Sequence, residues 1–468
     1  MSSPNQRKPQ SPTYVQPPSG GAQDVFQPHS MVVPLPLIER AQGIYQWDEF
    51  GTEYIDVSSG PVVSNIGHGN AHVADAMAKQ ARTMDFAYTR VARHRPNIDL
   101  TARIAKLAGP GFERVCLSSG GSEAIEIAIK FLRTYAVAFG EPKRTKIITC
   151  QPSYHGGTIA GLGMSGDEAL KPFLDGFSWT SERVPAPLSY RPPANHTHET
   201  WSRACAAALD DKIRNLGPEN VLAFMIEPVG GLATGCNVPT AEYFRLVREI
   251  CTKAGIAIVF DEVLCGTGRT GKFLAAHYWP DAMPDIVVMA KGLASGYTPL
   301  GATLLPAAMV DRLAEKTGFS FSHTYSANPI SCATAMAVLD EYDHFDLVRN
   351  AAEVGAYLKA GVLRLAEQSA IIGDVRGLGM LYAVEIVADK ATKRTLPVHE
   401  NPADGIRIHG LDNGLLIYSR RTASGKNGDW FMLSPPMTIT PAECDELLRR
   451  LSATIAAYEL QLRASKLI

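Results

Sequence analysis

Short apolar runs alternate with amphipathic stretches between about residues 100 and 310. The runs are β-branched or continuously apolar, as strands covered on both faces must be. Strand–helix alternation predicts an α/β fold with a mostly parallel sheet and right-handed crossovers. In such sheets, ligands bind beyond the carboxyl ends of the strands. The expected strands are 114–117, 146–149, 221–226, 256–260, 285–289 and 302–305.

Two of the helices between these strands have clear sequence signals. One is expected from Thr240, a good N-cap residue, to Gly255, a residue that suits a helix C-terminus. The other follows Ser122 and has apolar residues at helical spacing. Both helices lie between predicted strands along the chain.

The composition is that of an ordinary globular protein. The 468 residues are 46% apolar and 20% charged, and the formal net charge is −2. This near-neutral charge argues against nucleic-acid binding, which needs a basic surface. No apolar run approaches the roughly 18 residues of a membrane span, and no secretory signal is visible. We therefore expect a cytoplasmic protein that binds neither nucleic acid nor membrane.

The cysteines and the first thirty residues lie outside this α/β pattern. None of the eight cysteines forms a C-x-x-C pair, so we expect buried free thiols and no metal site or disulfide framework. Of residues 1–30, sixteen are Pro, Gln or Ser. Such a segment has little apolar surface to bury, which predicts a disordered tail; a partner-binding arm is the alternative.

Two loops that follow predicted strands have the character of a ligand site. A Ser- and Gly-rich loop follows 114–117 and opens a helix. There Gly121 permits close backbone approach, while the helix N-terminus and the Ser122 hydroxyl suit a phosphate; a plain capped turn is the alternative. After 146–149 come Tyr154 and His155. An aromatic ring at this place can stack on a flat ligand or simply pack on the core.

Two charged residues follow buried strands. Asp261 comes after 256–260, and a carboxylate there is costly unless it is paired. Its partner would be a protonated cofactor nitrogen or, alternatively, a structural cation. Lys291 follows 285–289, where loss of solvent lowers the pKa of the ammonium and makes the amine nucleophilic. Taken alone, Lys291 is better explained as a lysine at a strand end whose head group reaches solvent.

Together, these residues supply a phosphate grip, a ring stack, a pyridinium partner and a lysine for a Schiff base. Those are the parts that hold pyridoxal phosphate. Two G-x-G-x-x-G matches, Gly161–Gly166 and Gly266–Gly271, are a pattern that can mark a dinucleotide site. Neither falls in the tight turn between a strand and its helix, so we do not predict a nicotinamide cofactor.

The sequence resembles the class III aminotransferases, of the ω-amino acid and acetylornithine type, over nearly the whole chain from about Gly43 to about Tyr458. The resemblance implies a type I pyridoxal-phosphate fold with a large cofactor-binding domain at 81–339. A small α+β domain would be built from both chain ends, 31–80 and 340–468. The matching motifs are Ser119-Gly120-Gly121-Ser122-Glu123-Ala124, Tyr154-His155-Gly156, Ile226-Glu227-Pro228-Val229, Phe260-Asp261-Glu262-Val263, Lys291-Gly292-Leu293 and His323-Thr324-Tyr325-Ser326-Ala327-Asn328-Pro329.

The family pattern implies pyridoxal 5′-phosphate as the cofactor and gives roles to the residues that would surround it. Tyr154 would cover one ring face and Val263 the other. Asp261 would keep the ring nitrogen protonated. Lys291 would bind the cofactor covalently and then carry a proton between substrate and cofactor carbons.

Other matching residues would complete the cofactor site. Gly121 and Ser122 would bind the phosphate, and His155 and Glu227 would lie near the ring. The family glutamate that Glu227 matches can pair with an arginine. Thr324 would reach the phosphate of a neighbouring subunit, which implies a homodimer with shared active sites; a pairing of dimers into tetramers is left open.

The resemblance implies a ping-pong transaminase that moves an amino group from an amine or ω-amino acid to a 2-oxo acid, pyruvate or 2-oxoglutarate. A decarboxylase or aminomutase of the same family is one alternative, and a catalytically inactive scaffold is another. Many relatives bind a substrate carboxylate with an arginine ahead of a Pro-Pro pair. Arg420 and Arg421 are the candidates here, with two solvated loop arginines as the alternative. The stretch 58–63 would line the pocket without a bulky aromatic side chain.

Overall fold

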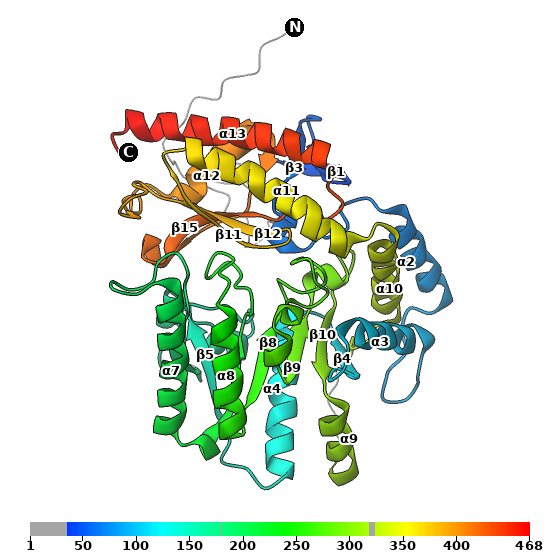
Figure 1. The fold of residues 1–468 in the computed structure, drawn as a ribbon. Helices are drawn as coiled ribbons and strands as arrows, with labels where there is room; N and C mark the ends of the chain where they lie inside the picture. Colours follow the sequence, from blue (N-terminus) through cyan, green and yellow to red (C-terminus); the bar gives the residue numbers. More distant parts are fainter. Residues whose placement is uncertain (1–34, 178, 318–322) are drawn as a thin grey trace.

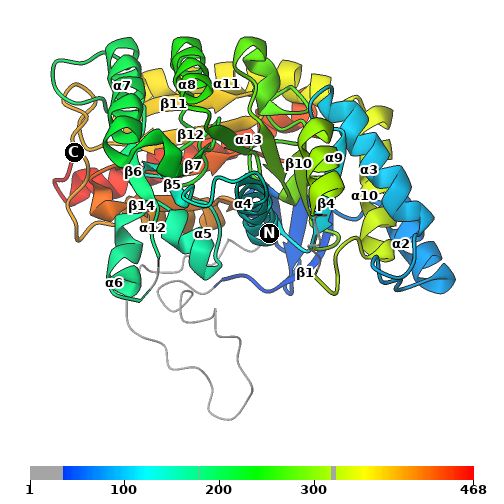
Figure 2. The same ribbon diagram turned by 90° about the horizontal axis from the view of Figure 1, so that it is seen from below.

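The computed structural model of the chain describes residues 35–177, 179–317 and 323–468. It contains three sheets, one large and central and two smaller ones (Figures 1 and 2). The predicted disordered tail at 1–30 lies outside the described residues. The strands of the central sheet are β4 (Arg114–Ser118), β5 (Lys146–Gln151), β6 (Glu182–Pro185), β7 (Val221–Ile226), β8 (Ala257–Asp261), β9 (Ile286–Met289) and β10 (Gly301–Leu305).

The central sheet has the strand order β4-β10-β9-β8-β7-β5-β6. The five strands from β9 to β6 are parallel neighbours, whereas β10 runs antiparallel to both β4 and β9. The mostly parallel sheet and all six predicted strands are therefore confirmed. The sequence reasoning missed β6, because this short edge strand carries Glu182 and Arg183 in place of an apolar run.

Helices cover both faces of the central sheet, which is why its strands are so apolar. Every residue of β7, β9 and β10 is buried. One face packs against α7 and α8 and the other against α4, as Figure 2 shows. The helices are α1 (Ser59–Val62), α2 (Ala71–Thr83), α3 (Arg95–Ala108), α4 (Gly121–Ala138), α5 (Ile159–Met164), α6 (Lys171–Leu174), α7 (His198–Leu216), α8 (Ala241–Ala254), α9 (Ala307–Lys316), α10 (Pro329–His344), α11 (Leu347–Gln368), α12 (Pro402–Asp412) and α13 (Pro441–Ala464).

Both predicted helices form with the expected ends. In α8 the side chain of Thr240 accepts a hydrogen bond from the Tyr243 N–H, and Gly255 adopts a left-handed conformation with φ of 63°. The α4 helix begins at Gly121, directly after the Ser- and Gly-rich loop. The loop therefore joins the end of β4 to a helix N-terminus, as the sequence predicts.

The two smaller sheets are built from the ends of the chain. In the first, the short strand β13 pairs parallel with β3, so that Leu415 lies opposite Ile55. The second is antiparallel and lies between α11 and α13 on its outer side and the central sheet on the other (Figure 1). The strands are β1 (Ile38–Gln42), β2 (Tyr45–Asp48), β3 (Glu53–Asp56) and β13 (Leu415–Leu416), then β11 (Ile372–Leu378), β12 (Leu381–Ile386), β14 (Ser419–Thr422) and β15 (Gly428–Leu433).

Two further observations concern the whole described chain. No helix in the described ranges is long and apolar enough to cross a membrane. The eight cysteines are free thiols, and all except the half-buried Cys116 are buried. The division into domains at 31–80, 81–339 and 340–468 stays a prediction.

Candidate active site

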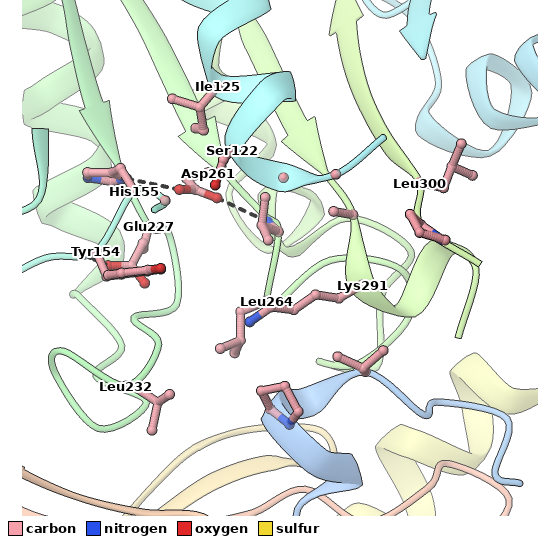
Figure 3. Close-up of a pocket in the computed structure, with 18 of the residues that line it drawn as sticks. Ser122, Ile125, Tyr154, His155, Glu227, Leu232, Asp261, Leu264, Lys291 and Leu300 are labelled. Carbon is pink, nitrogen blue, oxygen red and sulfur yellow. Dashed lines mark hydrogen bonds and ion pairs between the residues drawn. The ribbon is translucent and has the colours of Figure 1, made fainter. Parts of the chain in front are cut away.

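A cavity of about 600 Å³ lies at the carboxyl ends of the central strands, where the chain-end segments cover the sheet. Residues that follow β4, β5, β7, β8 and β9 form one wall, and Figure 3 shows how their side chains converge. Pro61, Val63, Tyr418 and Arg420 come from the chain-end segments. The expectation that 58–63 contributes to a pocket is thus confirmed at two positions.

Asp261 is the last residue of β8 and is buried. One carboxylate oxygen accepts a hydrogen bond from the Val263 N–H at 3.1 Å, and the other lies 2.9 Å from Nδ1 of His155. The His155 side chain is fully buried, and its Nε2 has no hydrogen-bond partner among the described residues. His155 therefore fixes the direction of the Asp261 carboxylate, which lines the cavity.

Lys291 follows β9 and begins a short 3₁₀ turn, Lys291–Leu293. Burial lowers the pKa of its ammonium, while the charges of Asp261 and Glu227 oppose that shift. The next residue must be small, because a Cβ on Gly292 would lie 2.1 Å from Nδ2 of Asn65. The turn thus places at the cavity a lysine that gives up its proton more readily than an exposed lysine does (Figure 3).

The Ser- and Gly-rich loop lines the cavity at the N-terminus of α4. A Cβ on Gly121 would lie 2.9 Å from Cγ1 of Val263, so only glycine allows these two residues to approach so closely. The Ser122 hydroxyl accepts a hydrogen bond from the Gly157 N–H at 3.0 Å. The structure thereby brings Gly121, Ser122 and Val263 together beside a helix N-terminus, where an anion is favoured.

Tyr154 and Glu227 follow β5 and β7 on the opposite side of the cavity from Lys291 (Figure 3). Glu227 accepts hydrogen bonds from the Tyr154 N–H at 3.1 Å and from the Gly231 N–H at 2.8 Å. Burial raises the pKa of Glu227, and the nearby His155 opposes this shift. Tyr154 is 43% exposed and lines the cavity.

The two candidate arginines of β14 point in opposite directions, as successive residues of a strand must. Arg420 lines the cavity and forms an ion pair with Asp167. Arg421 does not line the cavity; its guanidinium donates to the carbonyl oxygens of Leu396 at 2.9 Å and Pro397 at 3.3 Å. Of the pair, only Arg420 is placed to meet a ligand in this cavity.

Thr324 is exposed and does not line the cavity of its own chain. Its predicted contact with a phosphate requires a second subunit. That role stays a prediction.

Several residues at the cavity escaped the sequence reasoning. Leu264 directly follows the Asp261 motif and was within reach of it, whereas Leu232 and Tyr418 carry no chemical signal of their own. Asp167 does not line the cavity but forms an ion pair with Arg420; it comes directly after the G-x-G-x-x-G match at 161–166, in a loop with no chemical signal of its own. That match is no dinucleotide turn: it begins inside α5 and contains Gly163, where a Cβ would lie 2.2 Å from the Trp179 carbonyl oxygen.

The chain is similar to known transaminases in sequence and in structure. A diaminobutyrate–2-oxoglutarate transaminase of Halomonas elongata is 34% identical, over 88% of this chain and 88% of its own. A putrescine–pyruvate aminotransferase of Pseudomonas aeruginosa is 32% identical, also over 88% of each chain. The solved structure of an amine transaminase from an uncultivated Pseudomonas species, in its pyridoxal-phosphate-bound form, has a TM-score of 0.84 and 32% identity, and the match covers 96% of this chain and 99% of that one.

The family model for class-III aminotransferases matches residues 26–455, which include the whole cavity. A match of this length, with whole-chain relatives above 30% identity, identifies both the fold and the reaction class. The chain belongs to the class III aminotransferases, with the type I fold of the pyridoxal-phosphate transaminases.

Proposed function

We propose that this aminotransferase binds pyridoxal 5′-phosphate in the 600 Å³ cavity and moves an amino group from an amine or ω-amino acid to pyruvate or 2-oxoglutarate. The observation that carries the proposal is that Lys291 and Asp261 line the same cavity. Asp261 ends β8 and Lys291 follows the neighbouring strand β9, so that a buried carboxylate and a lysine of lowered pKa line one cavity.

The residues present fit this cofactor, on which the family depends. Gly121 has no Cβ, so the backbone at the N-terminus of α4 lies close against Val263, and a helix N-terminus suits a phosphate. Asp261 would pair with the ring nitrogen, while Tyr154 and Val263 would flank the ring. When bound, the cofactor supplies an aldehyde that condenses with amines and a ring that accepts electrons.

The chain's own residues would perform the proton transfers. Lys291 would hold the cofactor covalently until the substrate amine displaces it. The freed amine of Lys291 would then take a proton from the substrate carbon and deliver it to the cofactor. Its lowered pKa supports this role, because a neutral amine is needed to accept that proton. A 2-oxo acid would then reverse these steps, which makes the mechanism ping-pong.

The relatives and the cavity wall support the choice of substrates. Two relatives are named for an amine or diamino acid donor and a 2-oxo acid acceptor. In this chain, Pro61, Val63 and Leu264 provide apolar surface for the carbon skeleton. Arg420 provides a fork of donors that would bind a carboxylate of the acceptor or of an ω-amino acid.

The exposed surface beside Thr324 supports a homodimer with shared sites. Tyr325 is 64% exposed and packs edge-on against Phe86, which is 41% exposed, with ring centroids 6.4 Å apart. Apolar side chains gathered in this way are typical of a surface that a second subunit covers. The cytoplasmic location and any tetramer stay predictions.

Single half-reactions test this function. The purified protein loaded with pyridoxal phosphate should lose its visible absorbance band when an amine is added alone, and a 2-oxo acid should restore the band. Borohydride reduction should attach the cofactor to Lys291. Release of carbon dioxide, or an isomer formed without a 2-oxo acid, would contradict the proposal in favour of a decarboxylase or aminomutase.

A further inference from the structure

The ion pair with Asp167 ties Arg420, which lines the cavity, to a residue that is not part of the cavity lining. Arg420 lies on β14, whereas Asp167 follows α5, which is 253 residues earlier. The side chains are 30% and 11% exposed, so the carboxylate is the more covered of the two. The cation that faces the cavity is therefore already engaged by a carboxylate of the same chain.

The segment that carries Asp167 is anchored firmly to the active-site loop. The Gly166 N–H donates to Oγ of Ser153 at 3.1 Å, and the His155 N–H donates to Oγ of Ser165 at 2.9 Å. A Cβ on Gly166 would lie 2.4 Å from the Cys150 carbonyl oxygen, so the segment runs tightly against the end of β5. Asp167 is thus held in place by the same strand end that positions Tyr154 and His155.

Arg420 also stands close to the two phenol rings at the mouth of the cavity. Burial raises the pKa of Tyr154 and of Tyr418, and the positive charge of Arg420 opposes the shift at both. All three side chains line the same cavity. Glu227, the acid expected to pair with an arginine, instead accepts the N–H groups of Tyr154 and Gly231.

We propose that Asp167 is a specificity-determining residue, a built-in carboxylate that occupies Arg420 and that a substrate carboxylate must displace. With Asp167 in place, the wall presents a paired guanidinium that tolerates a neutral amine side chain. A substrate with a carboxylate binds only in the fraction of molecules whose Arg420 is released. If Arg420 is paired about 90% of the time, the apparent affinity for such a substrate falls about tenfold.

The inference rests on the proposed function for its substrates and is tested with a matched pair of amines. Pentylamine and 5-aminopentanoate have the same chain length, but the first ends in a methyl group and the second in a carboxylate. We expect Asp167→Asn to lower the KM for 5-aminopentanoate about tenfold, and to change the KM for pentylamine and both kcat values by less than about threefold. Asp167→Glu, which keeps the charge, should retain much of the wild-type ratio of the two KM values.

The neighbouring acid provides a matched control. Glu168 is exposed and lies 3.3 Å from Nζ of Lys426, away from Arg420. Glu168→Gln removes the same charge one position along the chain and should change neither KM. In an Arg420→Met background, Asp167→Asn should no longer alter the ratio of the two KM values, because the proposed effect of Asp167 depends on its ion pair with Arg420.

A binding measurement separates this inference from the proposed function. Calorimetric titration with pentanoate, a carboxylate without an amine, should show about tenfold tighter binding to the loaded Asp167→Asn enzyme than to wild type. An unchanged ratio of KM values, or a higher KM for 5-aminopentanoate in Asp167→Asn, would overturn the role of Asp167 while leaving transamination intact. If the wild type converts no amine at all, the proposed function fails, whatever the titration shows.

Discussion

The two walls of the cavity are built on different principles. The wall formed by the central sheet places Asp261, Lys291 and Ser122 directly after strands or at a helix start, where backbone and neighbouring side chains fix them. The wall formed by the chain ends carries Arg420 on a short strand, where a long side chain pairs with Asp167 of another segment. Backbone contacts hold the groups of the first wall, whereas the second presents a side chain with several rotatable bonds.

This difference separates chemistry from selectivity. Groups that handle protons and charge need fixed positions, because small displacements cost large factors in rate. A group that recognises different substrates gains from a side chain that can change partner. We therefore expect changes in the central-sheet wall to lower kcat for every substrate, and changes in the chain-end wall to alter KM selectively.

Loss of the lysine should have the largest effect. Lys291→Ala removes both the amine that binds the cofactor covalently and the group that carries the proton, so we expect turnover to fall about 10⁴-fold or more. Single-turnover absorbance measurements with an excess of amine would show it. Lys253→Ala, at an exposed position near the end of α8, serves as the control and should behave as wild type. If Lys291→Ala turned over at near the wild-type rate, the central-sheet wall would not carry the chemistry.

The carboxylate should come next. Asp261→Asn keeps the shape of the side chain but cannot hold a ring nitrogen protonated, so we expect kcat to fall about 100-fold or more with every amine. Circular dichroism should show an intact fold. A KM raised about 100-fold with an unchanged kcat would mean that the central-sheet wall also acts in substrate recognition. That result would contradict the distinction between the two walls.

His155 should have a smaller effect, because it acts through Asp261. Removing a hydrogen bond to a charged group costs about 1.5–3 kcal/mol, so we expect His155→Leu to lower kcat by about 10- to 150-fold. His155→Asn can still donate to the carboxylate and should recover part of the loss. If both variants lose the same amount, packing of the ring and not the hydrogen bond is the cause.

The paired arginines of β14 test the chain-end wall. Arg420→Ala should raise the KM for carboxylate substrates about tenfold and leave plain amines nearly unchanged. Arg421→Ala should leave both KM values unchanged but lower the free energy of unfolding by about 1–3 kcal/mol, since buried carbonyl groups lose their donor. Steady-state kinetics and urea unfolding distinguish the two results. A raised KM in Arg421→Ala would show that strand β14 rotates during binding and brings Arg421 to the cavity.

The pH dependence of Lys291 should be the smallest effect. Because burial lowers the pKa of its ammonium, attachment of the cofactor should speed up with rising pH and level off below the pH where an ordinary lysine titrates. In the cofactor-free protein the unfolded chain binds the extra proton, so stability should rise with pH between the lowered and the ordinary pKa. Lys291→Met should abolish that rise in thermal-unfolding experiments. A rise of equal size in Lys291→Met would assign it to other groups.

Much of the central-sheet wall could be predicted from the sequence. Continuous apolar runs predict buried strands, and Asp261 and Lys291 stand out because charged residues directly after such runs need a reason. The same reasoning missed β6, whose residues are polar, and Asp167, which lies in a loop without a pattern. The sequence reasoning also named both Arg420 and Arg421 as candidates for binding a substrate carboxylate. It could not choose between them, because the buried face of a strand is known only once its partners are known.

The sequence by itself determined the order of strands and helices, the turn glycines and the reactive side chains, since these depend on neighbours within a few positions along the chain. Only the tertiary structure decided that Arg420 faces the cavity while Arg421 turns away, and that Asp167, 253 residues distant, engages the first of them. Such pairings depend on how strand β14 packs on its sheet and on how a loop of the central layer approaches it. Local sequence carries no information about either of these contacts.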